Sequence, residues 1–336
     1  MATIIDVAHL AGVATSTVSR VLTGKAKISV ETQQKVFAAI EELKYRPDIV
    51  ARSLIRKKTD TVGLVLPRYV SHVSGFTMMI ETCQSYLNSF GKSLYIIQTS
   101  DRENSHIETI NALVDRGCDG ILLFHNFFFE KDNLTVERLG EIIDELSIPL
   151  VVMNAALPSH PFNCVWIDHL SLTCLATNYV IDLGHKQLAY LSAPLWQETA
   201  RLRLSGFQLA LKKNHLSSNS LAIVETDRSF EGGYAGMMKL LERKVEFTGL
   251  CCFNDAMAIG ALKAWQEYHP EHHPPVLIGI DNDPVLDYIT PNIHSVSIRM
   301  DLLSEYAVRL LMMHQNDNLD QAVPSRSIIG ELVIRG

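Results

Sequence analysis

The chain has 336 residues, of which 47% are hydrophobic and 20% charged, a composition typical of a soluble globular protein with two or three domains. It has no run of about eighteen apolar residues, and its N-terminus lacks the basic and apolar segments of a secretory signal, so we expect neither a membrane span nor export. The six cysteines form no C-x-x-C pair, which favours buried free thiols in a reducing cytoplasm.

Charge is distributed unevenly along the chain. Residues 1–58 carry ten Lys and Arg against five Asp and Glu, a net charge of +5. The rest carries 20 basic against 32 acidic side chains, a net charge of −12, and the two parts add to the formal −7. A basic head on an acidic body indicates that the head binds a polyanion, although a small solvated basic domain would give the same count.

The segment up to about residue 46 has the pattern of three short helices. Thr3, with Asp6 three residues later, predicts the N-cap of a helix that ends at Gly12. A second helix is expected over 16–22, and Ser29 is expected to cap a third over 32–43. Two helices joined by a short turn that contains glycine form a helix-turn-helix. The expected shared core comprises Val7, Ala8, Val18, Val21, Val36 and Ile40.

From residue 62 onward, short apolar strands alternate with amphipathic helices, a pattern typical of a parallel sheet with helices on both faces. Strands are expected at 62–67, 93–98, 119–124 and 148–154, with helices over 76–90, 103–116 and 135–145. The series then restarts, with strands at 164–168, 187–192, 221–225, 249–253 and 275–281 and helices over 170–183, 201–213, 231–243 and 255–267. This predicts two doubly wound lobes that bind a ligand beyond the carboxyl ends of their strands.

Six phrases occur in an informative order: "TIIDVAHLAGVATSTVSRVL", "YRPDIVARSL", "GHKQLAYL", "ARLRLSGF", "FNDAMAIGAL" and "IGIDND". Together they resemble the lactose/galactose-repressor (LacI/GalR) family of bacterial transcriptional regulators. The resemblance implies a helix-turn-helix domain at 1–46, a hinge helix and linker at 47–59, and a periplasmic-binding-protein-like effector-binding and dimerisation domain at 60–336. The lobes are expected at about 60–161 with 292–322, and at about 162–291 with 323–336.

The resemblance also implies how the head reads DNA. The second helix would enter the major groove, where the tips of Thr15, Ser16 and Arg20 reach base edges. Thr17, Ser19 and Thr3 would bind phosphate oxygens. The alternative is a solvated helix face rich in Ser and Thr.

Two positions depart from or extend this pattern. The family usually has Ser where this chain has Ala14, so either the N-cap hydroxyl is lost or Thr15 caps instead and moves the helix start by one residue. In the hinge, Leu54 matches the leucine that family members insert between base pairs, with Ala51 packed beside it. The alternative for Leu54 is an apolar residue of an amphipathic helix.

A sugar effector needs charged or amide side chains for paired hydrogen bonds and aromatic rings for stacking. Asp168, Asn254 and Asp281 each end an expected strand, and the resemblance assigns ligand contacts to Arg203, Asn254 and Asp281. Asp168 could instead cap a helix, and the aromatic residues could be core or subunit interface. The expected effector-binding residues are His72, Ser74, Phe76, Phe124, Asp168, Arg203, Asn254 and Asp281.

Several signals are discounted. "HPEHHPP" (269–275) has three histidines, but its prolines favour an exposed loop over a metal site. Cys251 and Cys252 should point to opposite faces of their strand, and Asp255 should be structural. No nucleotide motif or catalytic triad can be placed, so we expect neither a cofactor nor an enzyme.

The sequence therefore predicts a cytoplasmic, nucleoid-associated transcriptional repressor whose affinity for a pseudo-palindromic operator is controlled by a sugar or sugar derivative. The alternative is a sugar-binding protein or sugar-modifying enzyme with an accessory helix-turn-helix. The resemblance implies a homodimer. No leucine-heptad tail follows the last expected strand, "ELVIRG", so a tetramer is not expected.

Overall fold

The computed structural model describes residues 2–23, 28–45, 59–67, 75–99, 105–125, 135–316 and 326–336. The chain divides into two compact units, Met1–Thr59 and Asp60–Gly336, which are described separately. Four of the predicted site residues lie outside the described residues: Ala51 and Leu54 of the expected hinge, and the expected effector-binding residues His72 and Ser74.

The first unit contains the three expected helices, α1 (Ile4–Ala11), α2 (Thr15–Thr23) and α3 (Val30–Glu42). The predicted caps are confirmed. The Thr3 hydroxyl accepts from the Asp6 N–H, the Asp6 carboxylate accepts from the Thr3 N–H at 2.7 Å, and Gly12 ends α1 with φ +66°. The Ser29 hydroxyl likewise caps α3. The predicted core is confirmed: Val7, Val18 and Val36 are fully buried, Ala8 is 5% exposed, and Val21 and Ile40 pack against them.

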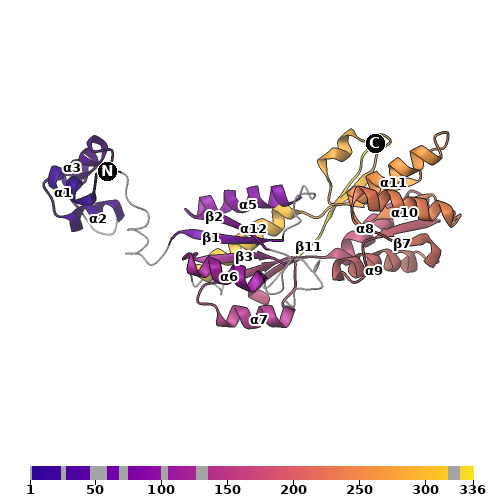
Figure 1. Ribbon diagram of the computed structural model, residues 1–336, viewed down its shortest axis with the longest axis horizontal. Helices are drawn as coiled ribbons and strands as arrows, with labels where there is room; N and C mark the ends of the chain where they lie inside the picture. Colours follow the sequence, from indigo (N-terminus) through magenta and orange to yellow (C-terminus); the bar gives the residue numbers. More distant parts are fainter. Residues whose placement is uncertain are drawn as a thin grey trace. The chain divides into compact units, whose positions relative to one another are not determined.

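In the first lobe of the second unit, six strands form a parallel sheet in the order β11-β5-β4-β3-β1-β2 (Figure 1). The strands are β1 (Thr61–Leu66), β2 (Ser93–Gln98), β3 (Gly120–Phe124), β4 (Leu150–Met153), β5 (Cys164–Ile167) and β11 (Ser327–Ile328). Leu64 and Leu122 share a core with α5 (Gly75–Ser89) and α12 (Met300–Gln315). Their neighbours Val65 and Leu123 share another with α6 (Ser105–Asp115) and α7 (Val136–Glu145), because successive strand residues face opposite sides.

The second lobe repeats this arrangement in the order β12-β10-β9-β8-β6-β7, in which only the β10–β12 pair is antiparallel. Its strands are β6 (Leu188–Ser192), β7 (Ile223–Glu225), β8 (Gly249–Cys252), β9 (Val276–Ile280), β10 (His294–Ser297) and β12 (Glu331–Val333). The covering helices are α8 (His169–Asp182), α9 (Glu198–Lys213), α10 (Phe230–Glu242) and α11 (Asp255–Tyr268). Short 3-10 helices occur at Ser220–Ala222 and Pro284–Tyr288 in this lobe and at Pro161–Asn163 in the first. Two doubly wound parallel-sheet lobes are thus confirmed.

The two cysteines on β8 show how the second sheet serves two cores. Cys251 packs with α8 and α9, whereas Cys252 packs with α10 and α11, so they face opposite sides as predicted. All six cysteines are free, and five are buried, as expected. Within the described residues, no helix is long and apolar enough to cross a membrane.

The chain changes lobe after β5, between β10 and α12, and between β11 and β12. The boundaries expected near 161, 291 and 322 lie before these points, because β5 and β11 were expected in the second lobe and β10 in the first. A short apolar strand has the same pattern in either sheet, and only its pairing partner decides which sheet it joins. The second crossing also brings α12, which was not among the expected helices, onto α5, β3, β4 and β5 of the first lobe.

Candidate functional site: a DNA-reading helix and an effector cavity

Helix α2 packs one side into the core of the first unit and leaves the other accessible. Val18 is fully buried, and its neighbours on the accessible side carry the hydroxyl groups noted in the sequence. An accessible row of hydroxyl and guanidinium groups on a short helix is suited to hydrogen bonding in a DNA groove. Of the predicted DNA-contact residues, Thr15, Ser16 and Arg20 are exposed, and Thr17 and Ser19 are half-buried.

Ala14 occupies the N-cap position of α2. The helix begins at Thr15, and the Ala14 carbonyl accepts from the N–H groups of Thr17 at 2.9 Å and Val18 at 3.2 Å. The alternative in which Thr15 becomes the cap is therefore wrong, because Thr15 is already the first helical residue. Alanine has no side-chain oxygen to accept from the first N–H groups of the helix, so this end lacks the stabilisation that Ser would give.

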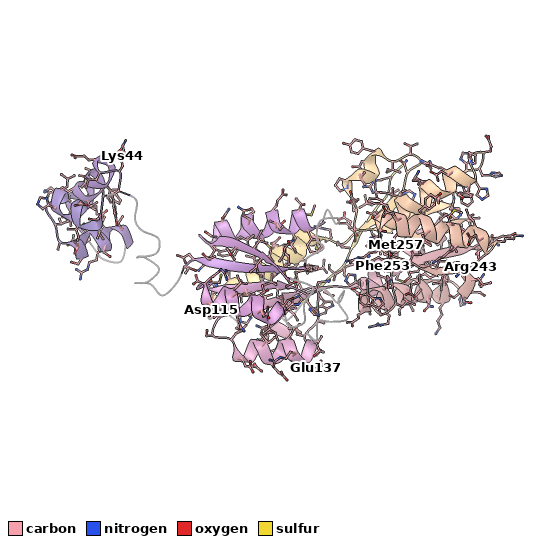
Figure 2. The ribbon with its side chains drawn as sticks, in the orientation of Figure 1. Lys44, Asp115, Glu137, Arg243, Phe253 and Met257 are labelled. Atoms are coloured by element: carbon pink, nitrogen blue, oxygen red, sulfur yellow. The ribbon has the colours of Figure 1, made fainter. Side chains whose placement is uncertain are left out.

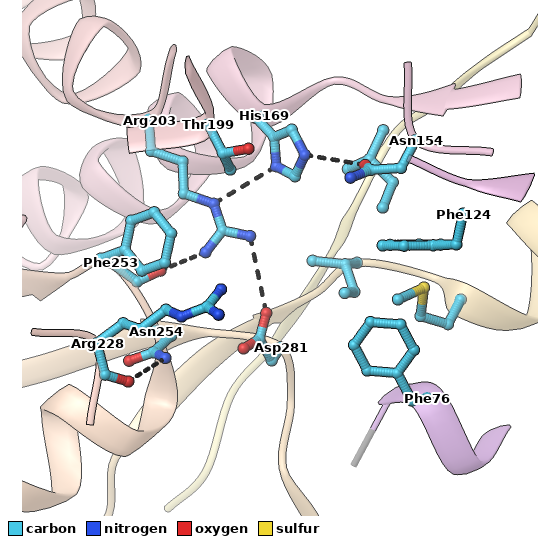
Figure 3. A pocket seen from close by; sticks show the side chains of 13 residues that line it. Phe76, Phe124, Asn154, His169, Thr199, Arg203, Arg228, Phe253, Asn254 and Asp281 are labelled. Carbon is cyan, nitrogen blue, oxygen red and sulfur yellow. Dashed lines mark hydrogen bonds and ion pairs between the residues drawn. The ribbon is translucent and has the colours of Figure 1, made fainter. Parts of the chain in front are cut away.

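A cavity lies at the carboxyl ends of the strands of both lobes (Figure 3). On the first-lobe side its wall is apolar: Phe76 and Phe124 pack edge to face, with ring centroids 5.0 Å apart. On the second-lobe side the wall is polar and charged. The described residues that line the cavity are Phe76, Phe124, Asn154, Ile167, His169, Thr199, Arg203, Arg228, Phe253, Asn254, Asp281, Ile298 and Met300.

Arg203, on α9, is the centre of the polar wall and is only 4% exposed. Its Nη1 donates to the carbonyl oxygen of Phe253, the residue after β8 (Figure 2), and its guanidinium lies 4.4 Å from the centroid of the Phe253 ring. Its Nη2 lies 3.7 Å from Oδ1 of Asp281. Because the Phe253 carbonyl, the Phe253 ring and Asp281 all contact the guanidinium, Arg203 presents its charge in a set direction.

A chain of hydrogen bonds leads from Arg203 to the first lobe. Arg203 Nε donates to Nδ1 of His169 at 3.4 Å, so the ring proton of His169 sits on Nε2 and is donated to Oδ1 of Asn154 at 3.1 Å. Asn154, just after β4, donates from Nδ2 to the His125 carbonyl at 3.3 Å. Burial, reinforced by the charge of Arg203, lowers the pKa of His169 well below its ordinary value, which keeps the ring neutral.

Asp281 follows β9 with a strained backbone, at φ +116°. Burial raises the pKa of its carboxyl from 3.8 to about 6, although Arg203 and Arg228 oppose this rise. Behind it, Asp255 accepts from the Asp283 N–H and the Ser295 hydroxyl, both at 2.7 Å. Asp255 is 1% exposed and ties the loop after β9 to α11, so its predicted structural role is confirmed.

Arg228 is a second cationic residue of the cavity and was not among the predicted effector-binding residues. It lies in the loop between β7 and α10, and its carbonyl accepts from Nδ2 of Asn254 at 3.0 Å. Oδ1 of Asn254 accepts from the Met257 N–H at 2.9 Å, so Asn254 caps α11 and also anchors the Arg228 loop. Because Arg228 follows a strand, the strand-end rule that selected Asn254 and Asp281 could have found it.

Five of the predicted effector residues come together in this cavity: Phe76, Phe124, Arg203, Asn254 and Asp281. Asp168 is outside its lining and caps α8 instead, accepting from the Ser171 N–H at 3.0 Å and the Ser171 hydroxyl at 2.6 Å. The next residue, His169, takes the place in the cavity wall. Among the described residues, no cluster of His, Cys, Asp or Glu is arranged to hold a metal ion.

A helix-turn-helix unit joined to a two-lobed domain with a cavity at its strand ends defines a class: DNA-binding regulators that carry a ligand-binding domain. Residues 3–48 match the model "Bacterial regulatory proteins, lacI family", and residues 177–336 match the periplasmic binding protein-like domain. The chain is 32% identical to the HTH-type transcriptional regulator AscG of Escherichia coli K12, with 100% of this chain and 98% of the relative covered.

It is also 32% identical to the HTH-type transcriptional repressor PurR of Pasteurella multocida, again over 100% of this chain and 98% of the relative. The chain therefore belongs to the lacI family and is a DNA-binding transcriptional regulator, as the motifs predicted.

Solved structures agree with this assignment. The crystal structure of E. coli AscG matches with a TM-score of 0.72 at 27% identity and covers 82% of this chain and 97% of its own. A lac repressor dimer bound to operator and the anti-inducer ONPF matches with a TM-score of 0.84 over 99% of this chain and 98% of its own. At 24% identity, this second likeness shows the fold.

Proposed function

We propose that the chain is a sequence-specific repressor that binds a two-fold-symmetric operator as a homodimer. Its affinity for the operator would rise or fall when a carbohydrate or carbohydrate derivative occupies the cavity. The observation that carries the effector part is the pairing of Arg203 and Asp281 opposite Phe76 and Phe124 in one cavity. A charged, hydrogen-bonding wall facing aromatic rings suits a ligand with many hydroxyl groups and an apolar ring face.

The DNA part is supported by the first unit. Its net charge of +5 suits the phosphate backbone of duplex DNA, and the accessible hydroxyl and guanidinium groups of α2 suit hydrogen bonding in a DNA groove. We propose that Thr15, Ser16 and Arg20 contact base edges, that Thr3, Thr17 and Ser19 contact phosphates, and that Leu54 with Ala51 wedges the minor groove. A regulator of this kind meets the chromosome in the bacterial cytoplasm, at the nucleoid.

Coupling between effector and operator would run through lobe closure. His169 belongs to the second lobe and Asn154 to the first, so their 3.1 Å hydrogen bond joins the two lobes beside the cavity. A ligand that draws Arg203 toward itself pulls on the His169 ring and through it on Asn154. The DNA-binding unit directly precedes the first lobe in the chain, so a change in that lobe can reach it through the linker.

Selection from random duplex DNA with the full chain tests the repressor function. We expect enrichment of a pseudo-palindromic site whose affinity falls steeply with salt. Arg20→Ala should weaken binding to that site by about tenfold to a hundredfold, since a bidentate Arg–guanine contact contributes about 1–3 kcal/mol. Lys213→Ala, which removes one positive charge near the end of α9, is the matched control and should change affinity little. Absence of any salt-sensitive sequence preference would refute the proposal.

The chain is proposed to have no enzymatic activity of its own. Its relatives AscG and PurR are named as a transcriptional regulator and a transcriptional repressor. Recovery of a bound sugar in chemically altered form would instead support a sugar-modifying enzyme with an accessory helix-turn-helix.

A further inference from the structure

Lys92 joins the amino ends of three strands in the first lobe. It lies directly before β2, and its Nζ donates at 3.1 Å each to Oδ1 of Asp60, directly before β1, and to Oδ2 of Asp119, directly before β3. The side chains of Lys92 and Asp119 are only 11% and 8% exposed. Burial lowers the pKa of Lys92, but the hydrogen bonds to Asp60 and Asp119 outweigh it and raise that pKa overall, so the ammonium group stays charged.

The main chain holds the same three strand ends together. The Ser93 N–H donates to the Asp60 carbonyl at 2.8 Å, and the Asp119 N–H donates to the Thr61 carbonyl at 2.8 Å. Asp60 has φ +53°, a left-handed conformation that Asp tolerates better than most residues do. Both the carboxylate and the carbonyl of Asp60 are therefore bonded to the residues at the start of β2.

Asp60 is also the point at which the linker reaches the second unit. The first unit ends at Thr59 and the second begins at Asp60, so the linker expected at 47–59 joins the first lobe at the residue that Lys92 binds. Asp60, Lys92 and Asp119 thus form a linker anchor. Because its side-chain and main-chain bonds act on one residue, the anchor gives the linker a fixed point of departure.

Two helices connect the linker anchor with the effector cavity. Helix α12 begins at Met300 in the cavity lining and ends at Gln315, whose Nε2 donates to the Asp119 carbonyl at 2.9 Å. Its 16 residues span about 24 Å at a rise of about 1.5 Å per residue. Helix α5 carries Phe76 of the cavity in its first turn, and the Lys92 N–H donates to a carbonyl in its last turn. A displacement at the cavity can therefore reach the anchor through two stiff elements.

We propose that Lys92 is a positioning residue for operator binding, which fixes Asp60 and so limits the directions in which the linker leaves the first lobe. A two-fold-symmetric operator sets one spacing between its half-sites. A restricted linker raises the effective concentration of the second DNA-binding unit of a dimer at that spacing and lowers it at others. The inference rests on the proposed repressor function and adds to it a residue that makes binding selective for half-site spacing.

Two variants weaken the linker anchor in different ways. Lys92→Met removes the ammonium group at nearly constant length. Asp60→Asn removes the charge of the more accessible carboxylate, which is 46% exposed, keeps a residue that tolerates the left-handed conformation, and leaves the pair of Lys92 and Asp119 in place. Lys92→Arg keeps the cation and should behave as the wild type. Lys186→Met, the matched control, makes the same change at an exposed site before β6 of the second lobe.

Hydrogen exchange of the full chain, resolved to single amides, tests the anchor without DNA. In Lys92→Met and Asp60→Asn, the N–H groups of Ser93 and Asp119 should exchange about tenfold faster than in the wild type, because local opening at these strand ends becomes easier. The Thr248 N–H donates to the Gln187 carbonyl at 2.9 Å before β8 of the second lobe and should be unchanged. Lys186→Met should change none of these amides.

Fluorescence anisotropy tests the effect on DNA binding. The probes are the duplex obtained by selection, the same duplex with two base pairs inserted at its centre, and a duplex with one half-site scrambled. The wild type should prefer the natural spacing about tenfold or more, and Lys92→Met and Asp60→Asn should reduce that preference about threefold or more. Binding to the single half-site and its dependence on salt should stay as in the wild type, because no phosphate contact is lost.

The inference is overturned if exchange at Ser93 and Asp119 is unchanged in both variants, or if both variants keep the full spacing preference. It is also overturned if they lose single half-site binding to the same degree, which would indicate general damage. Should Lys92→Met fail to fold, Asp60→Asn decides the matter. A wild type that prefers no two-half-site duplex would refute the repressor proposal, whereas a wild type that does, beside variants with unaltered preference, refutes only the role of Lys92.

Discussion

Replacing Asp281 by Asn should stabilise the second unit at neutral pH. The folded protein raises the pKa of this carboxyl from 3.8 to about 6, mainly because it is buried. Between these two pH values the folded state keeps a proton that the unfolded state has lost, so stability falls as pH rises. Each pKa unit corresponds to about 1.4 kcal/mol, so above pH 6 the ionised carboxylate costs the folded state about 3 kcal/mol.

Asn imitates the protonated carboxyl in size and avoids this cost. It also tolerates the positive φ of this position better than most residues do. We therefore expect Asp281→Asn to be more stable than the wild type by up to about 3 kcal/mol at pH 7.5 and equally stable near pH 4.

Urea unfolding between pH 4 and 8 measures this difference. Trp166, Trp196 and Trp265 all belong to the second unit, so tryptophan fluorescence reports on it alone. Both proteins are compared at one concentration, since association would shift the apparent stability. Glu271→Gln, which removes an exposed carboxylate before β9, should give no pH-dependent difference. The reasoning is refuted if Asp281→Asn is no more stable at pH 7.5 or if its advantage does not shrink as pH falls.

Three further predictions follow from the geometry of the two units. Ala14→Ser supplies the missing cap hydroxyl and should stabilise the helix-turn-helix by about 1 kcal/mol, measured as a higher Tm by circular dichroism of its transition; an unchanged or lower Tm would contradict the assignment of the cap. Val18→Ala opens a cavity in the fully buried core of the first unit and should cost about 2 kcal/mol, so that operator binding weakens while effector binding persists. Arg203→Ala should abolish the effector response measured by titration while operator binding by fluorescence anisotropy stays intact, and equal loss of both would indicate misfolding and remove the ligand assignment.

The features that the sequence predicted well depend on neighbours close in the chain. A capping box needs only Thr3 and Asp6, three residues apart, and the alternation of strands and helices is a local pattern. The strand-end rule found Asn254 and Asp281 because the carboxyl ends of parallel strands meet at one edge of a sheet.

The features that the sequence left open depend on distant partners. Asp168 also ends a strand, but its carboxylate accepts from the N–H and the hydroxyl of Ser171 and so caps α8 instead of lining the cavity. His169 joins the cavity because Arg203, 34 residues later, donates to it. Whether β5, β10 and β11 join the sheet of the first or the second lobe depends on which strands they pair with, and no local pattern encodes that choice.

The interleaved path of the chain between the lobes has a consequence for biosynthesis. The first lobe needs α12 and β11, so its sheet and one of its two helical layers cannot be completed until residue 328 has left the ribosome. The second lobe needs β12 as well, which ends only at Val333. The helix-turn-helix core, built from residues 4–45, is available from the start of synthesis. The nascent chain thus carries a nearly complete DNA-binding head long before it can sense a ligand. Strand edges that later pair with β11 and β12 stay exposed, and prone to aggregation, until those strands emerge.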